Sequence, residues 1–184
     1  MVMESMVAYV HRLLLQQQCE IAVDFTMGNG GDTLVLSKIA NIVHSFDIQD
    51  EAMQVTNKKI QEEHIKNVQL HKDSHLHFDR YIPSFDVGVF NLGYLPGGKH
   101  CITTMCSCTL LTLQKALDAL RPGGNIYIVI YTGHPEGQKE GEAITSFVSA
   151  LDHHVYSVDL RQMLNKKQAP YCITIEKSKK ANFS

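Results

Sequence analysis

The chain has 184 residues, 44% of them hydrophobic and 20% charged, an ordinary balance for a soluble globular protein and enough for one domain with a buried core. The formal net charge of −2 excludes a strongly basic protein, so any contact with nucleic acid must rest on a local basic patch. No apolar run reaches the roughly 18–20 residues of a membrane span, and residues 1–18 lack the pattern of a signal peptide. We therefore expect a cytoplasmic protein with no membrane partner.

Helical patterns alternate with short apolar runs, which predicts a mostly parallel, Rossmann-like sheet with helices on both faces. Helices are expected over residues 3–17, 33–40, 49–63, 107–120 and 142–151. Seven strands are expected over residues 21–25, 42–47, 68–71, 87–92, 125–131, 155–160 and 171–176, the last of them antiparallel. Residues 121–124 are interpreted as a helix stop, and the polar tail 177–184 is expected to fray. Residues 1–184 are predicted to form one domain, with an N-terminal helix within residues 1–18.

A glycine-rich turn joins the first predicted strand to the helix that follows it. The run from Asp24 to Thr33 reads Asp-Phe-Thr-Met-Gly-Asn-Gly-Gly-Asp-Thr. Glycines at such a turn let the backbone close tightly and let a ligand lie against the main chain. Asp47 ends the second predicted strand, at about the separation expected of a carboxylate that binds ribose hydroxyls. The two features together predict a cofactor that contains adenosine.

Two details of this turn favour S-adenosylmethionine (SAM) over a dinucleotide. The turn lacks the third, helix-packing glycine of the dinucleotide pattern. It also carries acids at Asp24 and Asp32, which would repel a pyrophosphate but suit the ammonium and sulfonium groups of SAM. An NAD-linked oxidoreductase is therefore disfavoured. The sequence therefore predicts the fold of a class I SAM-dependent methyltransferase.

Ligands of such sheets bind beyond the carboxyl ends of the parallel strands, which meet at one rim. Polar and glycine-rich residues follow the first four predicted parallel strands. The cofactor contacts are therefore predicted to come from Asp24, Thr26, Gly28, Asn29, Gly30, Asp32, Thr33, Asp47, Ile48, Gln49, Asp73, Ser74, His75, Asn91 and Gly93.

The fourth strand ends in Asn91-Leu92-Gly93-Tyr94, which partly resembles the Asn-Pro-Pro-Tyr turn of amino-group methyltransferases. An amine that attacks the methyl group of SAM must be neutral and held near contact distance. Asn91 can accept a hydrogen bond from its N–H, and Tyr94 can stack on a planar base. Both are predicted to be catalytic, with His134 as a candidate proton relay; a strand-end cap and a wall residue are the structural alternatives.

Two loops on the same rim are predicted to close over the substrate. Substrate contacts are expected from Tyr94, Leu95, Pro96, Gly97, Gly98, Lys99, Tyr131, His134 and Pro135. No metal site is expected, because the cysteines near His100 form no Cys-x-x-Cys pair and are more typical of packed thiols.

Four stretches of the sequence together resemble the bacterial "putative rRNA methylase" family of SAM-dependent methyltransferases. They are the glycine turn from Asp24 to Thr33, the run from Asn91 to Gly98, Pro122-Gly123-Gly124, and the run from Tyr131 to Pro135. The run from Asn91 to Gly98 is the specific part of the resemblance. Gly31 stands where a histidine is common in the family.

The resemblance implies a substrate that composition and spacing do not show. The characterised members of the family methylate the aminomethyl group of 5-aminomethyl-2-thiouridine at tRNA wobble position 34. The partner it implies is therefore the anticodon loop of a tRNA, whose wobble base can be extruded and stacked on an aromatic ring. The alternatives are an amine of an rRNA base, a small-molecule amine, and a non-catalytic SAM-binding module. A homodimer is possible through the first helix or the antiparallel edge of the sheet.

Overall fold

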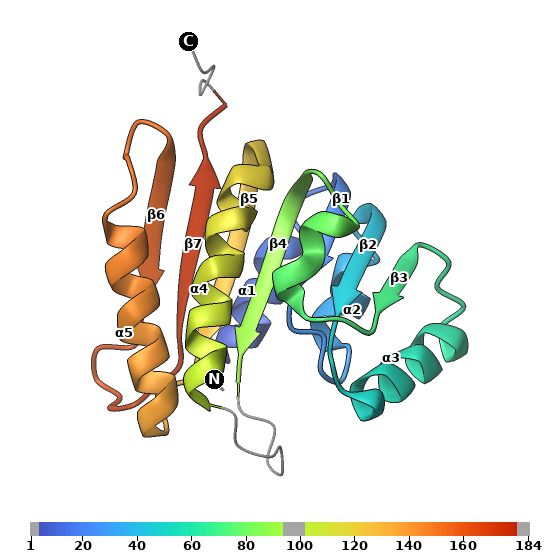
Figure 1. The fold of residues 1–184 in the computed structure, drawn as a ribbon, viewed down its shortest axis with the longest axis horizontal. Helices are drawn as coiled ribbons and strands as arrows, with labels where there is room; N and C mark the ends of the chain where they lie inside the picture. The colour runs from blue at the N-terminus through green and yellow to red at the C-terminus, as the bar shows by residue number, and fades with distance from the viewer. Residues whose placement is uncertain (1–3, 94–101, 180–184) are drawn as a thin grey trace.

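The structure is a computed structural model that describes residues 4–93 and 102–179 and the side chains of these residues except 102–106. Its centre is a seven-stranded sheet with the order β3-β2-β1-β4-β5-β7-β6 (Figure 1). The strands are β1 (Cys19–Asp24), β2 (Ala40–Phe46), β3 (Val68–His71), β4 (Phe85–Leu92), β5 (Leu120–Ile130), β6 (Tyr156–Arg161) and β7 (Tyr171–Lys177). Only β7 runs against the other strands of this sheet, so the predicted fold class is confirmed.

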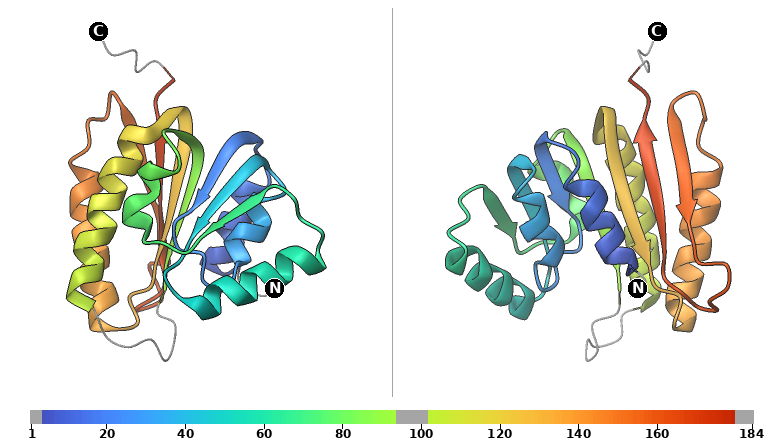
Figure 2. Two further views of the ribbon diagram at one scale, coloured as in Figure 1. Left: turned by 45° about the vertical axis from the view of Figure 1, so that its right-hand side comes forward. Right: turned by 180° about the vertical axis from the view of Figure 1, so that it is seen from behind.

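Helices cover both faces of the sheet (Figure 2). In chain order they are α1 (Met6–Leu14), α2 (Gly31–Leu36), α3 (Asp50–Glu62), the 3-10 helix η1 (His75–Arg80), α4 (Ile102–Ala119) and α5 (Pro135–Ser149). Among the described residues, no helix has both the length and the apolar character that a membrane span requires.

The first face of the sheet is covered by α1 and α2. Three side chains spaced along one stripe of α1, Met6, Val10 and Leu14, are buried against β1, β2, β4 and β5. Ser5 begins this helix, and its hydroxyl accepts a hydrogen bond from the main-chain N–H of Ala8 at 3.1 Å. The N-terminal helix is therefore an integral layer of the core and not an appendage.

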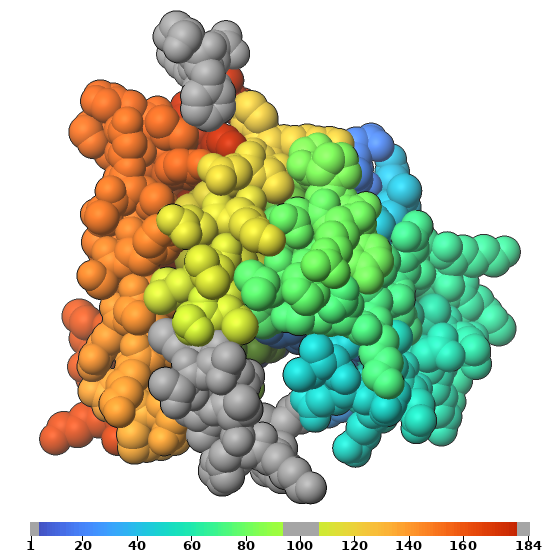
Figure 3. All heavy atoms as spheres, viewed as in Figure 1, coloured from blue at the N-terminus to red at the C-terminus, as the bar shows by residue number. Residues whose placement is uncertain are grey.

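The second face is covered by η1, α4 and α5, which form the left and centre of the near side of the molecule in Figure 3. Five phenylalanines supply much of this core, and Phe25 stacks on Phe90 with ring centroids 4.3 Å apart. Phe25 directly follows β1 and Phe90 lies in β4. This contact joins the chain after β1 to the neighbouring strand. Thr26 and Asn91 directly follow the two rings in the sequence.

Three expectations about element boundaries are wrong. β5 begins at Leu120, five residues before the predicted start at Asn125. Residues 121–124 follow the end of α4 at Ala119, as predicted, but they lie within this strand; the pairing of β4 with β5 is irregular there, and Gly123 has φ +81°. η1 was not predicted at all. α5 begins at Pro135, seven residues before the predicted start at Glu142, and so replaces part of the second rim loop.

Lys177 is a fourth correction, since it was assigned to the frayed tail. It ends β7 and is only 4% exposed. Its ammonium group donates hydrogen bonds to the carbonyls of Leu117 at 2.9 Å and Asp118 at 3.3 Å, near the carboxyl end of α4. A cation there satisfies carbonyls that the helix leaves unpaired.

Candidate active site

The glycine turn follows β1, beside the carboxyl end of β4. From β1 the chain goes to β2 and β3 on one side of the sheet, and it then returns to β4 on the other side of β1. Ligands of such sheets bind where the strand order reverses in this way. Gly28 and Gly30 adopt positive φ angles of +48° and +77°. A Cβ atom at Gly30 would also lie 2.7 Å from the side chain of Thr56. Two of the glycines singled out in the sequence are therefore required by the shape of the turn.

The turn is held from below by Asp24. This side chain is fully buried; its two carboxyl oxygens accept hydrogen bonds from Thr26 N at 3.1 Å and from Thr33 Oγ1 at 2.6 Å. Burial, and secondarily the charge of Asp32, raises the pKa of Asp24 to about 7. The structure thus places Asp24 beneath the turn, where it can act on a ligand through the backbone it supports.

The turn is held from the side by α3 and by Asp47. Asp47 Oδ2 accepts a hydrogen bond from Gly28 N at 3.0 Å, and Oδ1 accepts one from Gln49 N at 2.9 Å. Lys59 Nζ donates to the carbonyl of Asn29 at 2.6 Å. Each Asp47 oxygen keeps a further lone pair, so ribose hydroxyls can still be bound.

The turn after β3 is organised around Asp73. Its carboxyl group accepts hydrogen bonds from Ser74 N, His77 Nδ1 and Tyr81 OH at 2.7, 2.9 and 3.0 Å. The bond from His77 is the largest cause of the lowered pKa of Asp73. Asp73 and Ser74 therefore shape η1, which the sequence did not predict.

His75 is the clearest sign of a ligand on this rim. Its ring is partly buried beside Phe90, and burial lowers its pKa, while the nearby charge of Asp47 and a hydrogen bond with the Phe25 main chain oppose that shift. Among the described residues, its buried Nε2 atom has no hydrogen-bond partner. A buried polar atom without a partner is costly, and a bound molecule with a matching group would satisfy it.

Asn91, the last residue but one of β4, belongs to a network that joins three segments of the chain. Its main-chain N–H donates to Thr26 Oγ1 at 2.7 Å, and its side-chain Nδ2 donates to Asp32 Oδ2 at 3.0 Å. The other Asp32 oxygen, Oδ1, lies 2.6 Å from His11 Nε2. The sequence predicted Asn91 and Asp32 at the site but missed His11. Its place directly after Val10 and one turn before Leu14, both on the buried stripe of α1, was the available signal.

The far side of the rim is formed by the end of β5 and the start of α5. The Tyr131 ring lies 3.4 Å from the position that a Cβ atom on Gly93 would take, so these two residues pack together; their contacts with substrate and cofactor stay predictions. His134 caps α5, and its Nδ1 accepts a hydrogen bond from Gly137 N at 3.0 Å. Pro135 is the first residue of the helix. The structure therefore gives His134 a capping function, and its role as a proton relay stays a prediction.

Several predicted substrate contacts lie outside the described residues. They are Tyr94, Leu95, Pro96, Gly97, Gly98 and Lys99. Ile48, which is 67% exposed, and Gln49 follow Asp47 beyond the end of β2, and their contact with the cofactor stays a prediction.

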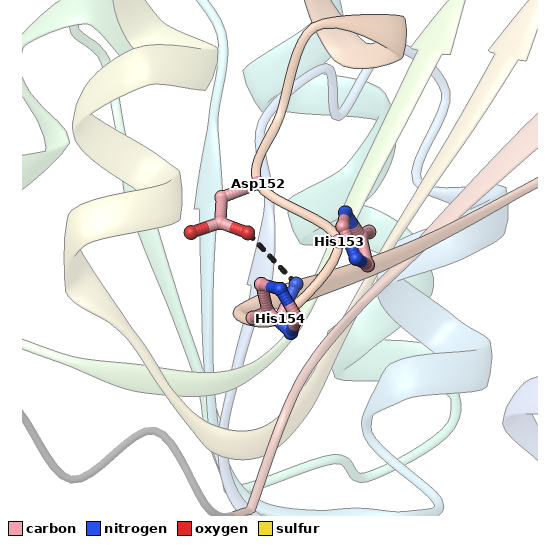
Figure 4. A group of neighbouring side chains, drawn as sticks. All are labelled: Asp152, His153 and His154. Carbon is pink, nitrogen blue, oxygen red and sulfur yellow. Dashed lines mark hydrogen bonds between the residues drawn. The ribbon is translucent and has the colours of Figure 1, made fainter.

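One group of described side chains has ligand atoms close enough together to hold a metal ion. It consists of Asp152, His153 and His154, whose ligand atoms lie within 4.8 Å of one another in the exposed turn between α5 and β6 (Figure 4). One Asp152 oxygen already accepts a hydrogen bond from His154 N at 2.9 Å. This turn contributes no residue to the rim described above.

Comparisons with known proteins agree with this geometry. Residues 43–177 match the family described as "Putative rRNA methylase". The curated tRNA (mnm(5)s(2)U34)-methyltransferase, chloroplastic, of Arabidopsis thaliana is 33% identical over 172 residues, which cover 85% of this chain and 63% of that protein. The chain thus spans less than two thirds of the length of this relative.

Two solved structures are similar over nearly the whole chain. One is the crystal structure of a "putative methyltransferase" from Streptococcus mutans in complex with SAH; it is 37% identical, has a TM-score of 0.86, and the match covers 96% of this chain and 99% of that one. The other is a "putative rRNA-methylase" from Clostridium thermocellum; it is 34% identical, has a TM-score of 0.88, and the match covers 96% and 100%.

The sheet order and the rim define the fold of a class I SAM-dependent methyltransferase. The chain belongs to the "Putative rRNA methylase" family. The prediction of SAM as the cofactor is confirmed by the same comparisons, since SAH is what SAM becomes after it donates its methyl group. The described residues fit this cofactor, because the positive-φ glycines, the spare lone pairs of Asp47 and the unpartnered His75 atom all lie on one rim.

Proposed function

We propose that this chain methylates the aminomethyl nitrogen of 5-aminomethyl-2-thiouridine at the wobble position of tRNA, giving 5-methylaminomethyl-2-thiouridine. The observation that carries the proposal is the orientation of Asn91 beside the glycine turn. Two further supports are the resemblance of residues 91–98 to the family motif and the tRNA methyltransferase of Arabidopsis thaliana at 33% identity.

The hydrogen bonds of Asn91 leave one atom of its side chain available to a substrate. Its amide nitrogen is directed at Asp32, so the amide oxygen Oδ1 is the atom left to accept a hydrogen bond. A primary alkylamine has N–H groups that such an oxygen can hold while the nitrogen lone pair is directed elsewhere. SAM, when bound, supplies the methyl group to that lone pair. The chain's own contribution is then mainly to position the amine and exclude water.

Tyr94 and Tyr131 are proposed as the residues that receive the base. Tyr131 is half-buried, with its pKa raised by burial and by the charge of Asp32, so its ring is close to the Asn91 network. A planar ring beside the amine-binding oxygen would let an extruded thiouridine stack while its aminomethyl arm reaches Asn91.

The test is methyl transfer from isotope-labelled SAM to tRNA that carries unmethylated 5-aminomethyl-2-thiouridine, read by nucleoside digestion and mass spectrometry. The expected result is a gain of one methyl group on that nucleoside. Asn91→Ala should lower turnover by about 100-fold at saturating SAM while SAM binding by calorimetry is largely kept. Asn57→Ala, on the exposed face of α3, is the matched control and should behave as the unchanged protein.

Three outcomes would contradict the proposal. Transfer to rRNA or a small amine and not to this nucleoside would change the substrate. SAM binding without transfer to any acceptor would make the chain a binding module. Undiminished turnover of Asn91→Ala would show that the amine is held by another group.

A further inference from the structure

Asp32 is the junction between the N-terminal helix and the strand end that carries Asn91. It lies in the first turn of α2 and its side chain is only 8% exposed. One of its oxygens accepts a hydrogen bond from Asn91 Nδ2 at 3.0 Å, and the other lies 2.6 Å from His11 Nε2. His11 and Asn91 are 80 positions apart in the sequence, and a single carboxyl group connects them.

We propose that His11 is a positioning residue for methyl transfer: it holds Asp32 in the orientation that fixes the Asn91 amide. This inference rests on the proposed function, since it assigns the orientation of Asn91 to a group on α1. His11 acts through Asp32 and is not itself assigned a contact with the substrate or the cofactor.

The geometry explains why Asp32 requires a second partner. A carboxyl group bonded through one oxygen only can rotate about its side-chain bonds, and its free oxygen would seek another donor. With both oxygens engaged from opposite elements, the carboxyl plane is held, and the Asn91 amide bonded to it is held as well. The amide then presents Oδ1, and not Nδ2, to an incoming amine.

His11 is well placed to act as a fixed point. Its neighbours on the α1 stripe, Val10 and Leu14, are 1% and 0% exposed, so the helix is anchored directly beside the ring. The imidazole itself is 25% exposed and lies at the rim. The docking of α1 is therefore carried by apolar side chains, and loss of one hydrogen bond at its edge should affect the site more than the fold.

Two substitutions separate a positioning role from a structural one. His11→Leu keeps the size and helix preference but removes the donor, whereas His11→Gln places an amide N–H near the position of Nε2. His153→Leu, in the exposed turn after α5, is the matched control. At saturating SAM we expect His11→Leu to lower kcat by about tenfold or more, His11→Gln to regain most of that loss, and His153→Leu to match the unchanged protein. The dissociation constant of SAM should change by less than about twofold in all three.

A second readout does not depend on turnover. The side-chain amide of Asn91 gives a pair of proton–nitrogen NMR signals, assigned by their absence in Asn91→Ala. In the protein without ligand, these signals should move in His11→Leu, return towards their original positions in His11→Gln and stay unchanged in His153→Leu. Unmoved Asn91 signals in His11→Leu would overturn the inference, as would an unchanged kcat or a loss of SAM affinity that equals the loss of kcat.

The proposed function and the positioning role of His11 can be contradicted independently of each other. If the unchanged protein transfers no methyl group to the tRNA, the proposed function fails, while the Asn91 signals still decide whether His11 positions this amide. If transfer occurs but neither kcat nor the signals respond to His11→Leu, the proposed function stands and His11 has no positioning role.

Discussion

The carboxyl group of Asp47 bonds directly to the glycine turn, with 3.0 Å between its Oδ2 atom and the main-chain nitrogen of Gly28. The residue that is expected to bind ribose therefore also determines the position of the backbone on which the rest of the cofactor is expected to lie. The expected ribose contact and the shape of the turn are coupled through one side chain, so a substitution of Asp47 should change both.

We expect Asp47→Ala to weaken SAM binding by about 1–3 kcal/mol, because hydrogen bonds to a charged group and one support of the turn are lost together. Isothermal calorimetry measures this change. Asp50→Ala is the control, since Asp50 is exposed and forms a surface ion pair with Lys72. Equal SAM affinity in Asp47→Ala and the unchanged protein would place the ribose contact elsewhere.

Gly30 and Gly31 offer a test of the turn by neighbouring substitutions. Gly30→Ala should lower the free energy of unfolding by about 1–3 kcal/mol, because φ is +77° and the new Cβ atom would lie 2.7 Å from the Thr56 side chain. Gly31→Ala should be tolerated, since nothing lies within 4 Å of its Cβ position. Urea denaturation of both variants decides this, and similar losses in the two would contradict the conformational argument.

Thr26 supports Asn91 from the other side of the rim. In Thr26→Val the Asn91 main-chain N–H loses the oxygen that accepts its hydrogen bond at 2.7 Å. We expect a stability loss of about 1–3 kcal/mol together with reduced turnover, measured by thermal unfolding and by methyl transfer. Thr26→Ser keeps the hydroxyl and should restore both, so an equally impaired serine variant would refute the role of this bond.

The buried Asp24 predicts a specific dependence of stability on pH. Its pKa in the folded chain is raised from 3.8 to about 7, so the folded protein retains a proton that the unfolded chain loses. This contribution to stability is full below pH 3.8 and is lost as the pH rises through 7. Asp24→Asn mimics the protonated state and removes the titration.

The difference in unfolding free energy between Asp24→Asn and the unchanged protein should therefore grow in favour of the variant from pH 4 to pH 7, by an amount of the order of 3 kcal/mol, and then level off. The variant is compared with the unchanged protein at each pH, because buried His44 also changes the stability of both. The pKa of His44 is lowered to about 4, so its contribution to stability is lost as the pH falls. A difference that does not vary with pH would show that Asp24 titrates normally.

Much of the fold could be predicted from the sequence because periodicity and turn chemistry agree along most of the chain. The strands of the parallel core contain continuous apolar runs, as in residues 126–130 of β5. The start of α5 was missed because Gly137 and Gly141 weaken the helical pattern. In the structure both glycines are required by close packing: a Cβ atom at Gly137 would clash with the Tyr131 carbonyl oxygen, and one at Gly141 would lie 2.5 Å from the Tyr171 hydroxyl.

The candidate site could be predicted where the strand ends carry it, and less well where distant segments converge. The glycine turn, Asp47 and Asn91 follow strands directly, so the sheet order brings them to one rim. His11 could not be assigned in this way, since its contact with Asp32 depends on how α1 crosses the sheet. The partners of Asp73 belong to η1, whose short 3-10 geometry has no strong periodic signal.

The position of β7 has a consequence for how the chain reaches this fold during synthesis. β7 lies between β5 and β6, yet it is the last of the seven strands along the sequence. The ribosome therefore makes β5 and β6 before the strand that joins them exists, and one edge of β5 stays unpaired until Tyr171–Lys177 has emerged. An open edge of this kind can pair with another nascent chain. The half of the sheet that holds the glycine turn and Asp47 has no such dependence, since β1, β2, β3 and β4 are all complete by Leu92.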